Sequence, residues 1–141
     1  MFLIGIPLLI IPFAIYNIIA LLMRDVRWTD QIAAINMMSG ATWTITFEDA
    51  LLTLAILLLF VEIFKASRAA SSRSLIDHML SMLLFIAMLI EFLLVAVAAT
   101  STFFLLMMIA FVDVIGGFAI TARAARRDVA IEEAVVPAER A

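Results

Sequence analysis

The chain contains no cysteine and a single histidine among its 141 residues. The absence of cysteine excludes disulfide bonds, thiol–disulfide exchange, thiolate metal sites and S-palmitoylation. One histidine is too few for a haem held by two imidazoles of the same chain. Glycine-rich phosphate loops and the basic patches typical of nucleic-acid binding are also missing. We therefore expect no cofactor, no metal site, no nucleic-acid partner and no catalytic residues, and hence no enzyme.

Charge is scarce as well, because 15% of the residues are charged and 67% are hydrophobic. Soluble domains contain about 45–50% apolar residues, so the excess must face lipid or other transmembrane helices. A helix needs roughly 20 apolar residues to cross a hydrocarbon core of about 30 Å. We expect four spans, at about 2–23, 46–64, 75–99 and 102–122. The prediction is an all-α integral membrane protein with a four-helix transmembrane domain, 1–127, and a cytoplasmic tail, 128–141.

The distribution of basic residues predicts the orientation of this domain. The connection between the second and third spans and the segment after the fourth together carry Lys65, Arg68, Arg73, Arg123, Arg126 and Arg127. The connection between the first two spans carries only Arg24 and Arg27. Because basic residues concentrate on the cytoplasmic side, both termini are expected in the cytoplasm. This asymmetry, with the preference for arginine over lysine, favours a bacterial cytoplasmic (inner) membrane.

The connection between the first two spans, 24–45, is the largest element expected outside the membrane. Thr29 is a candidate helix cap, and Gly40 is a candidate helix end. Ile32, Ile35 and Met38 would lie on one face of the helix between them. Trp28 and Trp43 flank the segment, as is typical at headgroup depth. We therefore expect a short interfacial helix here, and an ordinary polar loop is the alternative.

Two acids, Glu91 and Asp113, lie inside the last two spans without a basic residue at the same depth. Counting from the short connection between these spans places them roughly one helical turn apart in depth. Asn17 in the first span falls near the depth of Glu91. These three residues are a candidate polar contact or proton relay, because two such acids can share one proton. The alternative is a permanently neutral acid, bonded to a backbone carbonyl, to Asn17 or to a partner subunit.

Nearer the cytoplasmic side, Glu62 and His78 come to the same depth and form a candidate pair in that leaflet. The alternative for Glu62 is a local pair with Lys65, three residues further along the same helix. Ala110, Gly116 and Gly117 form a small-residue groove around Asp113, where another helix could approach closely. We therefore expect these three residues to be helix-packing positions.

The functional hypothesis that this pattern favours is a small non-catalytic accessory or assembly subunit of a larger membrane protein complex. Its partners would be the lipid bilayer and another membrane protein. The alternative is a homo-oligomeric proton-coupled transporter or ion pathway that uses the membrane carboxylates. A quinone pocket beside His78 stays a third possibility, since such a pocket needs little more than one donor and an apolar slot.

Overall fold

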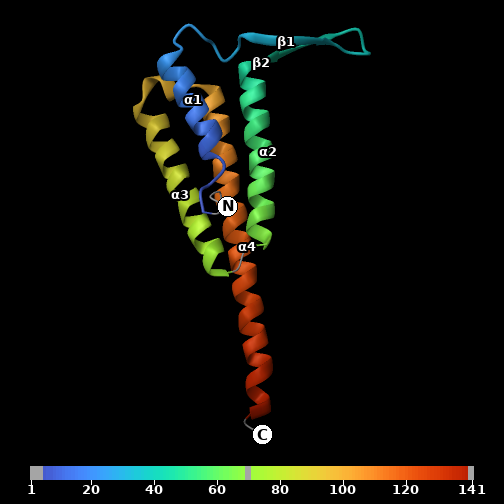
Figure 1. Ribbon diagram of the computed structural model, residues 1–141, viewed down its shortest axis with the longest axis vertical. Coiled ribbons are helices and arrows are strands. Elements are labelled where there is room, and N and C mark those ends of the chain that lie inside the picture. Colours follow the sequence, from blue (N-terminus) through green and yellow to red (C-terminus); the bar gives the residue numbers. More distant parts are fainter. Residues whose placement is uncertain (1–4, 69–70, 140–141) are drawn as a thin grey trace.

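The computed structural model of the protein describes residues 5–68 and 71–139, and side chains within 5–68 and 75–135. It is mostly helical. The elements in chain order are α1 (Ile10–Leu22), β1 (Gln31–Asn36), β2 (Thr42–Thr46), α2 (Phe47–Arg68), α3 (Ser71–Leu94), the short 3₁₀ helix η1 (Ala96–Ala98) and α4 (Ser101–Glu139). The helices lie side by side in one bundle, and the two strands project from one end of it (Figure 1).

Within the described residues, three helices are long and apolar enough to cross a membrane: Phe47–Arg68, Leu75–Leu94 and Ser101–Val135. The first of these has 22 residues, which corresponds to ~33 Å at the rise of an α-helix and matches the hydrocarbon core. Their length and composition indicate a membrane location. The four-span topology and the orientation of the termini remain predictions.

The expected first span, 2–23, is helical only from Ile10 among the residues that the structure describes. Gly5 has a φ of 124°, which only glycine adopts easily, and Pro7 lacks a backbone N–H. Pro12 falls in the first turn of α1, where a missing N–H breaks no intrahelical bond. The 13 residues of α1 extend only ~20 Å, so this helix is too short to cross a bilayer by itself.

Tyr16 packs α1 against the end of the bundle at which α3 and α4 are joined. Its side chain is fully buried, and its hydroxyl donates to the carbonyl of Val97 at 2.8 Å and lies 2.6 Å from Oγ1 of Thr100. The ring stacks on Trp28 and meets Phe103 edge to face. One aromatic side chain thus joins α1, the strand connection and the turn between α3 and α4.

The prediction of an interfacial helix between the first two spans is wrong, because this segment forms an antiparallel hairpin of β1 and β2. Thr42–Thr46 alternates threonine with Trp43 and Ile45, a composition that favours strand over helix. Gly40 has a φ of 85° and lies in the turn between the strands, where Met37 N–H donates to the carbonyl of Ala41 at 2.8 Å. Gly40 therefore reverses the chain rather than ending a helix.

The boundaries of the long helices follow from local signals. At the start of α2, Thr46 and Asp49 cap each other's backbone N–H groups, in a reciprocal arrangement that ends the strand and begins the helix. The fourth span and the expected tail are one helix, since α4 continues to Glu139. Its 39 residues extend ~58 Å, and Figure 1 shows its second half projecting alone beyond the bundle.

Candidate functional site

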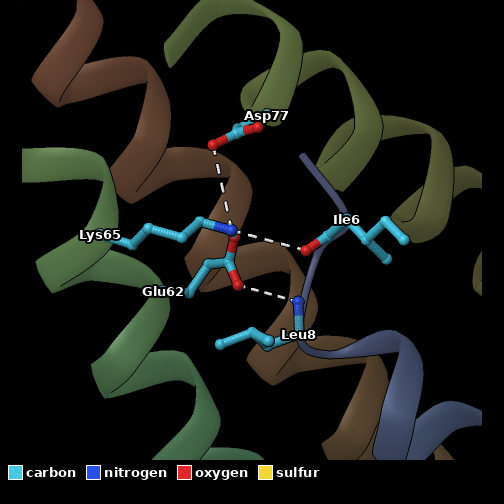
Figure 2. A network of polar contacts seen from close by, with 5 residues as sticks. All are labelled: Ile6, Leu8, Glu62, Lys65 and Asp77. Carbon is cyan, nitrogen blue, oxygen red and sulfur yellow. Dashed lines mark hydrogen bonds and ion pairs between the residues drawn. The ribbon is translucent and has the colours of Figure 1, made fainter. Parts of the chain in front are cut away.

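The N-terminal segment before α1 is held by two side chains of α2, Glu62 and Lys65 (Figure 2). The N–H of Leu8 donates to Oε2 of Glu62 at 2.8 Å, and Nζ of Lys65 donates to the carbonyl of Ile6 at 3.5 Å. This segment is not helical, so these backbone groups lack intrahelical partners. Irregular backbone at membrane depth is tolerated only where protein satisfies its polar groups. The two side chains supply that satisfaction.

Glu62 and Lys65 also form an ion pair with each other. Nζ of Lys65 lies 2.9 Å from Oε1 of Glu62, at a spacing of three residues on α2. Glu62 is 4% exposed, and it lies about six residues, or ~9 Å, from the end of its helix. Asp77 of α3 approaches the same ammonium group at 3.9 Å (Figure 2). A buried carboxylate requires such a partner, because an unpaired charge away from water is strongly destabilising.

A second group of polar side chains lies between α3 and α4. Asp113 and Ser81 are each 6% exposed, and the side chain of Ser81 lies near the carboxyl of Asp113. Nδ1 of His78 is buried and has no hydrogen-bond partner within the described part of the chain. Glu62, Lys65 and His78 all lie close enough to act electrostatically on Asp113. We call Glu62, Lys65, Asp77, His78, Ser81 and Asp113 the inner polar layer.

The absence of a side chain at Gly117 leaves room for the ring of His78. A Cβ atom at this position would lie 2.7 Å from Nδ1 of His78, closer than real Cβ contacts come. A Cβ at Gly116 would meet nothing within 4 Å. Ala110, at 2% exposure, is buried in the core. Ala110 and Gly117 therefore lie at close packing positions, whereas Gly116 faces open space.

A separate polar contact joins α1 and α3 near the opposite end of the bundle. Nδ2 of Asn17 donates to Oε2 of Glu91 at 3.3 Å and to the carbonyl of Phe13 at 3.2 Å. The other carboxyl oxygen, Oε1 of Glu91, is buried and unpartnered among the described residues. An open groove of about 550 Å³ runs beside this contact, lined by Asn17, Leu21, Ala87, Ile90, Glu91, Leu94 and Val95. The expected contact of Asn17 with Glu91 is thus formed.

Glu91 and Asp113 do not bond each other. Phe85 packs on Phe111, and Phe92 packs on Phe103 and Phe104. This register places Glu91 level with about residue 104, so Asp113 lies about nine residues away, or ~13 Å in depth. The sequence count placed the turn near residues 99–102, but α3 ends at Leu94 and the chain reverses around η1. Every level on α3 therefore shifts relative to α4.

The buried side chains of Leu84, Met88, Leu106, Met107 and Ala110 belong to the apolar core.

The expected pair of Glu62 with His78 is not among the contacts of Glu62, whose carboxyl oxygens bond Lys65 and Leu8 instead. The local alternative with Lys65 is formed, because a spacing of three residues on one helix brings these side chains together. Sequence reasoning missed Tyr16, Ser81 and Asp77 as members of polar contacts. The one tyrosine of the chain, placed inside an apolar stretch, was the signal for Tyr16, since a buried hydroxyl needs a partner.

No group of three or more acidic or histidine side chains that could hold a metal ion occurs within the described residues. No protein-family model, curated protein or solved structure matches the chain. The geometry of the chain's own residues therefore carries the functional argument. That geometry consists of an inner polar layer bonded largely within the chain and a separate contact between Asn17 and Glu91.

Proposed function

We propose that the protein is a small non-catalytic accessory or assembly subunit of a larger membrane protein complex. The observation that carries the proposal is the second half of α4, which leaves the bundle as a single helix (Figure 1). From Ala125 to Val135 every described side chain is exposed. A lone helix of this length is marginal in water, because most helical stability in proteins comes from packing an apolar face against other elements. A partner on this side of the membrane would supply that packing.

The composition of the projecting helix supports a protein contact. It carries exposed Val129, Ile131 and Val135, together with charged residues of both signs. Basic side chains lie nearer the bundle, at Arg123, Arg126 and Arg127, and acidic ones lie further out, at Asp128, Glu132 and Glu133. Arginines next to a membrane span anchor it at the headgroups. The acidic and apolar residues beyond them remain available for a partner.

The inner polar layer supports a structural role in the same proposal. Glu62 and Lys65 of α2 hold the backbone of the segment before α1. Each of these bonds joins two elements of the chain itself. We place the protein in a bacterial inner membrane with both termini in the cytoplasm, which puts the projecting helix of α4 on the cytoplasmic side.

A proton-coupled transporter or ion pathway is the second candidate. Asp113, which is buried near His78, favours it, because the Nδ1 of His78 is also buried and has no partner among the described residues. The separation from Glu91 counts against it. The two carboxyl groups lie ~13 Å apart in depth, and the space between them would have to fill with water for a proton to pass. The accessory role needs no such change.

The test is native mass spectrometry of the tagged protein, purified gently from its own membrane. A stoichiometric foreign partner is expected for the full chain and should be lost when residues 128–141 are deleted. The matched control replaces Arg140 by alanine, which leaves the helix through Glu139 in place and should retain the partner. A lone homo-oligomer, with proton flux in liposomes that falls in Asp113→Asn, would replace the accessory role by transport.

A further inference from the structure

The pairing of β1 with β2 sorts the hairpin side chains onto two different faces. Residues that oppose each other in a hairpin share a face, and successive residues of a strand alternate between faces. Ala33 opposes Ile45 and Ile35 opposes Trp43, so these four side chains lie on one face. We call them the hairpin apolar face. The pairs Ala34–Thr44 and Asn36–Thr42 lie on the other, polar face.

One contact supports this assignment. Oγ1 of Thr42 donates to Oδ1 of Asn36 at 3.0 Å, as expected for neighbours on the polar face. Ile45 and Thr46, on opposite faces, are both half-buried where the hairpin joins the bundle, and the other residues of the two strands are exposed. Both faces are therefore open along most of the hairpin.

The direction of the hairpin is set by its junction with a membrane-spanning helix. β2 ends at Thr46, and α2 begins at Phe47. The N–H of Phe47 donates to Asp30 at 3.2 Å, and the N–H of Glu48 donates to Trp28 at 3.0 Å, both to backbone carbonyls. These bonds hold the base of the hairpin at the end of the bundle. Figure 1 shows the hairpin extending sideways, roughly perpendicular to α2 and beyond the outline of the helices.

Charge and composition indicate what lies beneath this projection. Residues 31–47 contain no charged side chain, whereas Asp30 and Glu48 lie directly on either side. Soluble proteins protect free strand edges with charged residues or proline, and this hairpin has neither. Tryptophan is enriched at the membrane–water interface, where one end of its ring is apolar and the other is hydrated. A hairpin in the plane of the membrane surface needs no charge on its lower face.

We infer that the hairpin apolar face rests on the lipid surface of the outer leaflet, with Trp43 at headgroup depth and the polar face in water. The occupant of this face is the bilayer itself, since the hairpin extends sideways from the end of the bundle at which α2, a helix of membrane-spanning length, begins (Figure 1). The strands have 6 and 5 residues, so they reach ~15–20 Å over the lipid. This inference does not depend on the accessory role, and it rests on the proposed orientation only for the leaflet that it names.

Two adjacent alanines on opposite faces provide the test. The chain has no cysteine, so Ala33→Cys and Ala34→Cys each introduce a single thiol with a similar small change of side chain. Each variant is reconstituted in phosphatidylcholine liposomes at low protein-to-lipid ratio and treated with a charged, membrane-impermeant maleimide. Ala34→Cys is expected to react fast and Ala33→Cys to be protected. Both must react equally after unfolding in detergent and urea, which controls for intrinsic reactivity.

Fluorescence identifies the group that protects the face. Trp28→Phe keeps a ring against Tyr16 and leaves Trp43 as the only tryptophan. In bilayers of brominated phosphatidylcholine its emission should be strongly quenched, and iodide in the water should have little effect. Equal labelling of both cysteines, or faster labelling of Ala33→Cys, would overturn the inference. Protection without quenching by brominated lipid, or protection that appears only at high protein density, would overturn it in favour of a protein occupant.

Discussion

Gly117→Ala tests the packing of His78 against α4 at Gly117. The added Cβ would lie 2.7 Å from Nδ1 of His78 and 3.5 Å from two further ring atoms. The imidazole must move or the helices must separate. Overpacking of this kind costs about 1–3 kcal/mol.

A matched control separates this effect from helix propensity. Alanine is favoured over glycine inside a helix by about 1 kcal/mol, and this gain applies to both adjacent glycines of α4. Gly116→Ala adds the same methyl group where nothing lies within 4 Å. We expect Gly116→Ala to be neutral or stabilising. Gly117→Ala should be less stable than Gly116→Ala by about 1–3 kcal/mol, because only this variant meets the ring.

The assay is the free energy of unfolding in mixed detergent micelles, followed by circular dichroism as the fraction of denaturing detergent is raised. His78→Ala in the Gly117→Ala background removes the ring that the methyl group meets. The double variant should therefore be no less stable than the single His78→Ala variant, because the added methyl group no longer meets the ring. Equal stability of Gly117→Ala and Gly116→Ala would refute the close packing of His78 on Gly117.

Substitutions at three further residues test the polar contacts by the same unfolding assay. Glu62→Ala should destabilise by about 1–3 kcal/mol, because it removes the close partner of Lys65 and the acceptor of the Leu8 N–H and leaves Lys65 only the longer contact with Asp77. Glu62→Gln keeps an acceptor for Leu8 and should cost less; equal losses would refute the contribution of the bond to Leu8. Tyr16→Phe should cost about 1–2 kcal/mol, because the hydroxyl bonds at the α3–α4 turn are lost, and an unchanged stability would contradict that anchoring. Asp113→Asn should stay within about 1 kcal/mol of the natural protein, since an amide of the same shape can still form hydrogen bonds at this buried position; a loss of proton flux with intact assembly would instead favour transport.

The sequence predicted the long helices because their signal is simple. Apolar stretches of sufficient length with few charges identify α2, α3 and the first half of α4, and the reversal between α3 and α4 follows from a short connection. The start of α1 was harder to predict. Proline and glycine before Ile10 are compatible with a kinked helix or with an interrupted one. The choice depends on whether another element satisfies the freed backbone groups, and here Glu62 and Lys65 of α2 do so.

The hairpin shows why local periodicity misled. Ile32, Ile35 and Met38 recur at intervals of three, which suggests a helix face. In the structure Ile35 belongs to the hairpin apolar face with Trp43, its partner on β2. The cross-strand pairs that make this face join residues that are not neighbours in the sequence, and helical periodicity does not detect them. The alternation of Thr42–Thr46 was the available signal for a strand, and Gly40 fits the turn that a hairpin requires.

The candidate site shows which part of a membrane-depth estimate is reliable. Asn17 and Glu91 were placed at the same depth by counting and do bond each other. The count failed for Asp113, because the residues from Val95 to Thr100 form the turn instead of extending both helices. A few residues of helix lost at a turn change the depth difference from one helical turn to ~13 Å. That shift turns a possible shared proton into two independent contacts, and it is the reason to assign structural roles to Glu91 and Asp113 before transport roles.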